Sequence, residues 1–156
     1  MSKPWVRGVM WMLVAAVMVM IFCFSAQDGE ASTDTSDKVV KPIVAAVARK
    51  NPTMTSSMLN RLYQQLQTIV RKGAHFMEFA LLGITLRLLG ESYGWRRRGW
   101  IAWGTGTFYA MTDEMHQLLS SGRMASGRDV AIDSMGVCAG VVLTIVVLRR
   151  IYQRIR

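Results

Sequence analysis

The stretch DVAIDSMGVCAGVVLTIVVL, residues 129–148, contains the clearest structural signal in the sequence. From residue 130 onward it is almost entirely apolar, and it can cross the roughly 30 Å of membrane hydrocarbon as a helix, which takes about 17 to 25 residues. Three more runs are as long or nearly so, at residues 8–26, 73–89 and 100–119. The sequence therefore predicts an all-α fold, a four-helix transmembrane bundle over residues 8–26, 73–89, 100–119 and 130–148, in a single domain of residues 1–156.

The composition separates apolar from basic residues. Hydrophobic residues make up 51% of the 156 residues, yet the formal net charge is +9. Many Lys and Arg residues lie just outside the apolar runs, where anionic headgroups and the positive-inside rule account for them. A nucleic-acid-binding protein would instead carry them along one face of a soluble fold. We therefore expect a lipid bilayer as partner and no nucleic acid. Cys23 and Cys138 fall inside apolar runs and are interpreted as small hydrophobic residues, not as a disulfide.

Two compact arginine clusters predict the orientation. Arg96, Arg97 and Arg98 link the second and third runs, and Arg149, Arg150, Arg154 and Arg156 follow the fourth. The positive-inside rule places both clusters, and with them both termini, in the cytoplasm. We interpret the triplet at residues 96–98 as a topology and headgroup device, not as a ligand site. The first run resembles a signal peptide, but Phe24 stands where cleavage needs a small residue, so we expect it to be retained.

The segment between the first two runs, residues 27–72, is expected to lie outside the cytoplasm. It opens with polar residues that are typical of a flexible linker, and Pro42 and Pro52 interrupt it. After Thr53, which could cap a helix, apolar residues recur at helical spacing. This pattern predicts an amphipathic helical extracytoplasmic segment that lies on the membrane or caps the bundle. The residues of the stripe are Met58, Leu59, Leu62, Tyr63, Leu66, Ile69 and Val70.

Ionisable residues inside spanning helices are costly, so their positions indicate function. Most of them lie toward the outer ends of the last three runs, which a four-pass topology brings together on one side of the membrane. Gly136 and Gly140 form a pair of small residues that allows a neighbouring helix to approach closely, which turns Asp133 into the bundle. The residues expected to converge are Lys72, His75, Glu78, Asp113, Glu114, His116, Gln117, Arg123, Asp129 and Asp133.

The residue types in this group allow acid–base chemistry on a bound ligand. Glu114 or Glu78 would be a general base, and His75 or His116 an acid or a metal ligand. The spacings match no metal-binding motif, and the sequence indicates neither a cofactor nor an oligomeric state. The alternative is a buried ion-pair network with a purely structural role. Catalytic candidates are His75, Glu78, Asp113, Glu114, His116 and Arg123, and substrate-binding candidates are Lys72, Gln117, Arg123, Asp129 and Asp133, with Arg123 clamping a phosphate.

Several polar motifs in this order resemble the VanZ-like family of bacterial integral membrane proteins. They are KGAHFMEF at 72–79, DEMHQ at 113–117, GR at 122–123 and DVAIDSMG at 129–136, with Phe24, Ser25 and Gln27 at the end of the first run. The sequence departs from the family at Phe79, where tyrosine is frequent, and at Ser121, where proline is frequent. The resemblance implies a multi-pass protein of the bacterial cytoplasmic membrane and a link to resistance against teicoplanin-type glycopeptide antibiotics.

Three functions remain open at this point. The first is a cell-envelope protein that alters the access of an antibiotic, or of its lipid-linked target, to the outer leaflet, as the resemblance implies. The second is a membrane enzyme acting on a phospholipid headgroup or a lipid-linked envelope precursor. The third is a structural or assembly module. We expect the polar residues to line one cavity in the second case, and to pair with one another without a cavity in the third.

Overall fold

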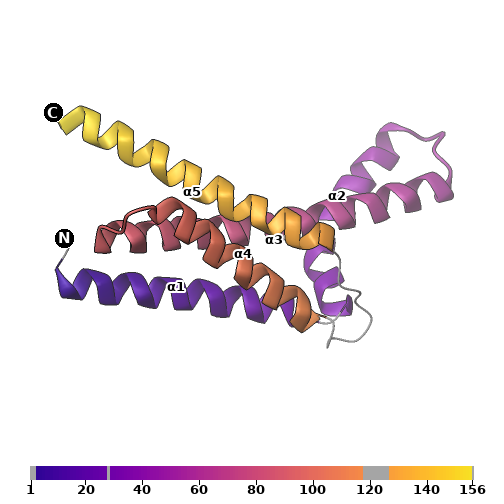
Figure 1. Ribbon diagram of the computed structural model, residues 1–156. Coiled ribbons are helices and arrows are strands. Elements are labelled where there is room, and N and C mark those ends of the chain that lie inside the picture. The colour runs from indigo at the N-terminus through magenta and orange to yellow at the C-terminus, as the bar shows by residue number, and fades with distance from the viewer. Residues whose placement is uncertain (1–2, 28, 118–126, 156) are drawn as a thin grey trace.

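The part of the chain that the structure describes folds into five helices. The computed structural model describes residues 3–27, 29–117 and 127–155, and within these ranges all regular elements are α-helices, with no strand. The all-α class is therefore confirmed. The helices are α1 (Pro4–Ser25), α2 (Gly29–Lys50), α3 (Ser56–Tyr93), α4 (Arg98–Gln117) and α5 (Gly127–Ile155) (Figure 1).

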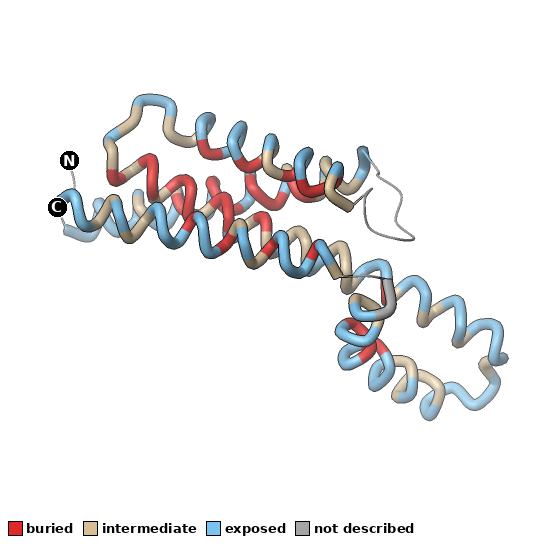
Figure 2. Tube along the Cα trace, turned by 90° about the horizontal axis from the view of Figure 1, so that it is seen from below, coloured by how far each residue is buried: buried red, intermediate tan, exposed pale blue. Residues whose placement is uncertain are grey.

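The helices form a bundle and an arm. α1, the second half of α3, α4 and α5 run side by side, whereas α2 and the first half of α3 project as a helical arm from one end (Figures 1 and 2). The N- and C-termini both lie at the opposite end. Buried residues follow the faces that the bundle helices turn toward one another (Figure 2). The apolar core consists of Val14, Val17, Ile21, Phe79, Leu82, Leu86, Leu89, Ala102, Ala110, Val137 and Val141.

Two of the four expected membrane spans meet a length and hydropathy criterion in the structure. They are Pro4–Ser25 and Gly127–Ile155. The expected spans at residues 73–89 and 100–119 fall within α3 and α4, which do not meet the criterion over the described residues. Glu78 and Arg87 lower the hydropathy of α3, and glycine, threonine and the pair Asp113 and Glu114 lower that of α4.

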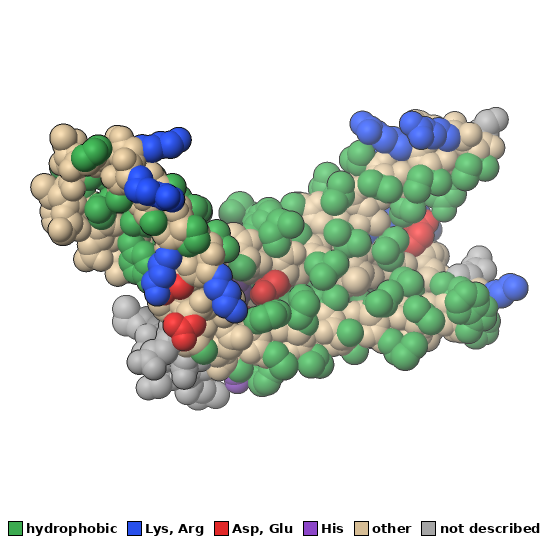
Figure 3. Space-filling view, turned by 180° about the vertical axis from the view of Figure 1, so that it is seen from behind, with side chains coloured by type: hydrophobic (Ala, Val, Ile, Leu, Met, Phe, Trp, Pro, Cys, Tyr) green, Lys and Arg blue, Asp and Glu red, His purple; other side chains and the backbone are tan. Residues whose placement is uncertain are grey.

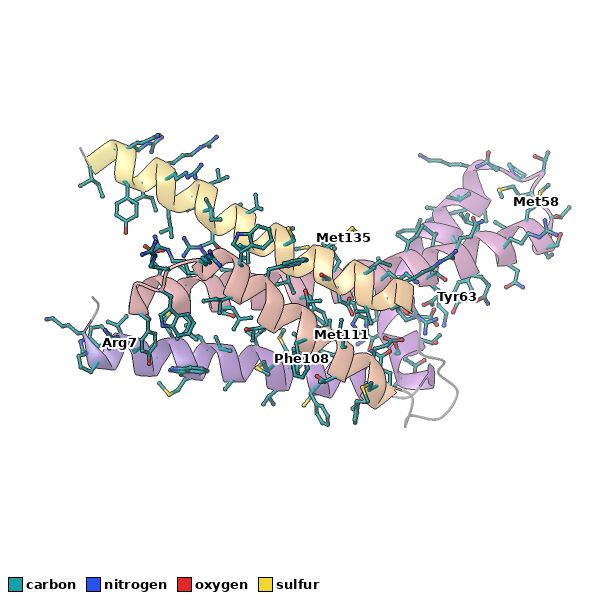
Figure 4. All side chains as sticks on the ribbon, in the orientation of Figure 1. Arg7, Met58, Tyr63, Phe108, Met111 and Met135 are labelled. Carbon is teal, nitrogen blue, oxygen red and sulfur yellow. The ribbon has the colours of Figure 1, made fainter. Side chains whose placement is uncertain are left out.

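The second half of the arm differs from the prediction in its extent. The expected amphipathic helix and the expected second span form one continuous helix, α3, of 38 residues. The helix is capped by Thr55 rather than by Thr53, because Thr55 Oγ1 accepts a hydrogen bond from the Met58 backbone N at 3.4 Å. It ends at Gly94, whose φ of 68° is the left-handed conformation that terminates many helices. Met58 accordingly lies near the tip of the arm (Figure 4).

The polar stretch after residue 28 is a helix, which corrects the prediction of a flexible linker. α2 continues through Pro42. Contacts with α3 support this helix, because Asp37 accepts a hydrogen bond from the Tyr63 hydroxyl of α3 at 2.6 Å. Within α2, Asp37 also forms an ion pair with Lys41 at 2.7 Å. The hydrogen bonds from Lys41 and Tyr63 hold the pKa of Asp37 below its ordinary value. Gln67 contacts both Asp37 and Ser36.

Close backbone contact joins α3 and α5. A Cβ atom on Gly140 would lie 2.0 Å from the Ala80 carbonyl oxygen, and one on Gly136 would lie 2.4 Å from the Phe76 carbonyl oxygen. Both distances are far inside van der Waals contact, so only glycine fits at these positions. The predicted role of this pair is therefore confirmed. Asp133, on the same helix, is only 3% exposed and faces the bundle as predicted.

We expect Gly140→Leu to lower the stability of the bundle by about 1 to 3 kcal/mol, because the larger side chain forces α3 and α5 apart. Thermal unfolding in detergent measures this effect. Gly104→Leu is a matched control, since no atom lies within 4 Å of a Cβ built on Gly104. Equal unfolding temperatures for the two variants would contradict the close contact.

Candidate functional site

A polar cavity opens where the arm joins the bundle. It has a volume of about 200 Å³ and lies between the middle of α3, the end of α4 and the start of α5. Figure 3 shows acidic and basic side chains grouped near this junction, whereas many hydrophobic side chains cover the bundle beside it. The lining residues are Thr68, Arg71, Lys72 and His75 from α3, Glu114 and Gln117 from α4, and Asp129, Ile132 and Asp133 from α5.

Helical periodicity explains why each helix presents these residues together. The four residues of α3 are spaced by three, four and seven positions, which places them on one face of a helix with 3.6 residues per turn. The residues of α5 follow the same spacing. The structure thus brings six of the candidate residues to one cavity, namely Lys72, His75, Glu114, Gln117, Asp129 and Asp133.

The cavity carries charges of both signs. Lys72 Nζ forms an ion pair with Asp129 Oδ1 across the α3–α5 interface. Both side chains are partly exposed, so solvent screening leaves this pair a small effect on stability, on the order of 0 to 1 kcal/mol. Glu114 and Asp133, in contrast, are 5% and 3% exposed. The cavity therefore combines cations near its open side with carboxylates at its buried side.

Asp113 belongs to a separate network that faces α1. The buried Ser25 hydroxyl donates a hydrogen bond to Asp113 Oδ2 at 2.9 Å. Gln117 Nε2 donates to Ser25 Oγ at 2.7 Å and to Asp113 Oδ2 at 3.0 Å. Gln117 thus lies between this network and the cavity. His116 also turns toward α1, and its ring lies 4.5 Å from that of Phe22.

Three of the predicted candidates do not line the cavity. They are Glu78, Asp113 and His116. The atoms Glu78 Oε2, Asp113 Oδ1 and His116 Nδ1 are buried and have no hydrogen-bond partner among the described residues. Buried polar atoms are usually paired, so these positions are suited to bind water or a proton. Arg123, the remaining candidate, lies outside the described residues.

Three residues of these networks were not among the predicted candidates. Arg71 and Thr68 line the cavity, and Ser25 holds Asp113. Arg71 lies four positions before His75, so helical spacing from His75 could have identified it. Ser25 was noted only as part of the family resemblance, because no spacing within one helix connects it to α4.

The arrangement of these side chains can hold a polar ligand and exchange protons with it. The described ranges contain no group of three or more His, Cys, Asp or Glu side chains placed to hold a metal ion. His75 and Glu114 line the same cavity, so an acid–base pair acting on one ligand is geometrically possible. The catalytic roles assigned to individual residues remain predictions.

We expect Ser25→Ala to destabilise the protein by about 1 to 3 kcal/mol, because it removes a partner from the buried carboxylate of Asp113. Thermal unfolding in detergent is the measurement. Ser56→Ala, at an exposed position on the arm, is the control and should change stability by less than about 0.5 kcal/mol. An unchanged Ser25→Ala variant would argue against the network with α1.

Comparison with known proteins identifies the family. A family model described as VanZ/LLP1 matches residues 10–149, which include every candidate residue and both networks described above. Among curated proteins and among solved structures there is no significant match. The match covers most of the chain and agrees with the resemblance carried by the polar motifs at residues 72–79, 113–117 and 129–136. The chain therefore belongs to the VanZ/LLP1 family.

Proposed function

We propose that this chain is a multi-pass membrane protein whose polar cavity binds the phosphorylated headgroup of a phospholipid or of a lipid-linked envelope precursor. The cavity between α3, α4 and α5 is the observation on which the proposal rests. Arg71 and Lys72 offer cations to a phosphate, and Gln117 and the carboxylates offer hydrogen-bonding groups to hydroxyls. A volume of about 200 Å³ is smaller than that of typical small-molecule pockets, roughly 300 to 1,000 Å³, so it suits a headgroup rather than a whole lipid.

The surface of the bundle supports four crossings. Helix α4 exposes large apolar side chains along its length, among them Phe108 and Met111, and α5 exposes Met135 (Figure 4). Extended exposed apolar surface needs a hydrophobic neighbour, and lipid provides one. The polar residues that lower the hydropathy of α3 and α4 are turned inward, as Arg87, Asp113 and Glu114 show. Inward-facing ionisable residues are the arrangement found in spanning helices.

The positive-inside rule supports the orientation. The α3–α4 turn with Arg96 and Arg97 and the end of α5 with Arg149 lie near one another, at the end of the bundle that holds both termini. A cytoplasmic location of this end puts the arm and the polar cavity at the outer face of the membrane. A ligand in the outer leaflet would then reach the cavity from the side of the arm.

A second candidate function is catalysis on the bound headgroup. His75 and Glu114 line one cavity together, which favours acid–base chemistry there. A purely structural role accounts for the Lys72–Asp129 ion pair but leaves the cavity without a purpose. Glycopeptide resistance remains a prediction that follows from the resemblance. Headgroup binding would explain such resistance only if the ligand is a lipid-linked precursor.

Topology reporters test the membrane arrangement. We expect a reporter fused after Arg156 and one inserted in the α3–α4 turn at Arg96 to be cytoplasmic, and one inserted at Pro52 between α2 and α3 to be extracytoplasmic. The Arg96 position is decisive, because a protein crossing only with α1 and α5 would place it outside. An extracytoplasmic Arg156 fusion would reverse the orientation.

Headgroup binding is tested with full-length protein in phosphatidylcholine nanodiscs that contain a photoactivatable phosphatidylglycerol labelled at its headgroup. We expect crosslinks to cavity residues, and a loss of about tenfold with Arg71→Gln, the factor for one charge-assisted hydrogen bond of about 1.4 kcal/mol. Arg61→Gln removes an equal charge from an exposed arm position that does not line the cavity and should have little effect.

Protein abundance separates binding from scaffolding. Glu114→Gln should reduce activity or binding while the protein stays abundant, because Glu114 borders the cavity and water can reach it there. If Glu114 were half of a structural ion pair, its removal would cost about 3 to 5 kcal/mol and deplete the protein from the membrane. Depletion by Glu114→Gln and unchanged crosslinking in Arg71→Gln would together replace the binding proposal with the structural module.

A further inference from the structure

A second cavity lies at the opposite end of the bundle, where the termini are. It has a volume of about 680 Å³ and is formed by the end of α3, the α3–α4 turn and the end of α5. We propose that it binds the phosphate of an anionic phospholipid in the leaflet on that side, at a site separate from the polar cavity near the arm. This inference uses the membrane location proposed above, but it does not depend on what the polar cavity binds.

The charge of this cavity is strongly positive. Five arginines line it, Arg87, Arg96, Arg97, Arg98 and Arg149, against a single acidic residue, Glu91. Glu91 Oε2 accepts hydrogen bonds from Arg87 Nη1 at 2.6 Å and from Arg98 Nε at 2.8 Å. One carboxylate therefore serves two guanidinium groups, and the other three arginines add charge that no lining residue balances. Such a cavity favours an anion.

Arg87 shows that part of this cavity is preformed. Only 6% of the residue is exposed, and its Nε is buried without a hydrogen-bond partner among the described residues. Burying a guanidinium is costly unless its donors are paired. Arg87 pairs with Glu91 through its Nη1 atom. Its Nε atom therefore remains an unused hydrogen-bond donor in the wall of a basic cavity. A phosphate oxygen would supply the missing acceptor, and guanidinium groups bind phosphate through two parallel donors.

The backbone of the α3–α4 turn brings the arginines to the cavity. Gly94 and Arg97 both have positive φ, 68° and 57°, and Arg97 is the only residue other than glycine with this conformation in the described chain. A strained residue of this kind persists only where its surroundings hold it, often at ligand sites. A Cβ on Gly90 would lie 2.9 Å from Arg98 Cβ, so the absence of a side chain there lets α4 begin directly against α3.

The location of the cavity favours a lipid as the source of the phosphate. Trp100 and Tyr152, which line it, are also exposed to the surroundings, and aromatic residues with a polar edge are enriched at headgroup depth. Basic pockets between spanning helices at a cytoplasmic face bind anionic headgroups. Figure 3 shows basic side chains gathered along the end of α5, above a surface that is largely apolar. A soluble phosphate compound shares the same chemistry and is distinguished by experiment.

The test uses full-length protein in detergent, with phosphatidylglycerol and phosphatidylcholine as probes and native mass spectrometry as the readout. Arg149→Gln and Arg150→Gln form a matched pair, because both remove one charge from adjacent exposed positions and only Arg149 lines the cavity. We expect Arg149→Gln to weaken phosphatidylglycerol binding about fivefold, the factor for one cation near an anionic headgroup, and Arg150→Gln to weaken it less than twofold. Phosphatidylcholine should be retained weakly by all proteins.

Two further variants examine the buried part of the site. Arg87→Lys keeps the charge opposite Glu91 but removes the planar donor fork, so we expect weaker phosphatidylglycerol binding while the fold is kept. Arg97→Gln removes a charge from the turn and should act like Arg149→Gln. If Arg87→Lys does not fold, the comparison of Arg149 with Arg150 still decides the proposal.

The outcomes separate the possible sources of the phosphate. Retention of phosphatidylglycerol that depends on Arg149 supports a lipid site. Displacement of that lipid by millimolar inorganic phosphate, with the same dependence on Arg149, supports the phosphate chemistry and points to a soluble ligand. Equal losses in Arg149→Gln and Arg150→Gln would overturn the proposal, since they indicate only general attraction to a basic surface. Equal binding of the two lipids by unaltered protein would overturn it as well. A loss of crosslinking at the polar cavity would concern the proposed function only and would not change the interpretation of these lipid-binding results.

Discussion

The backbone contact between α3 and α5 at Gly136 and Gly140 is the constraint on which the rest of the molecule depends. It brings the two longest helices so close that the start of α5 lies against the middle of α3. Asp129 and Asp133 thereby meet Lys72 and His75, and the cavity forms beside them. At the other end α5 diverges from α3 (Figure 1), and the space between its end and the α3–α4 turn is the arginine-lined cavity. One close contact thus gives rise to two sites.

The protein accommodates several of its buried charges by hydrogen bonds and ion pairs between or within helices. Ser25 and Gln117 hold one oxygen of Asp113, and Glu91 neutralises much of the charge of Arg87 and Arg98. Each arrangement limits the cost of burying a charge in an apolar bundle. The same residues lower the hydropathy of α3 and α4. Over the described residues a hydropathy criterion therefore identifies only α1 and α5, although α4 also exposes large apolar side chains.

The two ends of the bundle carry cavities of different charge. The cavity near the arm mixes cations with buried carboxylates, which suits a ligand with hydroxyl and phosphate groups. The cavity near the termini is almost purely cationic and suits a phosphate. Within the arm, Asp37 contacts Tyr63 and Lys41. The α3 half of the arm continues without a break into the bundle. Helix α3 therefore contributes residues to both cavities.

The sequence by itself determined the helical class, the approximate positions of the bundle helices, the close contact of α5 and six residues of the polar cavity, although α3 and α5 extend beyond the predicted spans. These features follow from the spacing of residues within single helices, and that spacing is visible in the local sequence. Tertiary structure decided the rest. Asp113 and Glu114 are adjacent, so they point about 100° apart, and only the packing of α4 shows that one faces α1 and the other the cavity. Contacts with α3 likewise made a helix of the polar segment α2. The packing of α5 near the α3–α4 turn placed the arginines at 96–98, interpreted from the sequence as a topology and headgroup device, in the wall of a cavity. Neighbouring segments decide how each helix is rotated about its axis and which distant residues pair. No single stretch of sequence contains those neighbours.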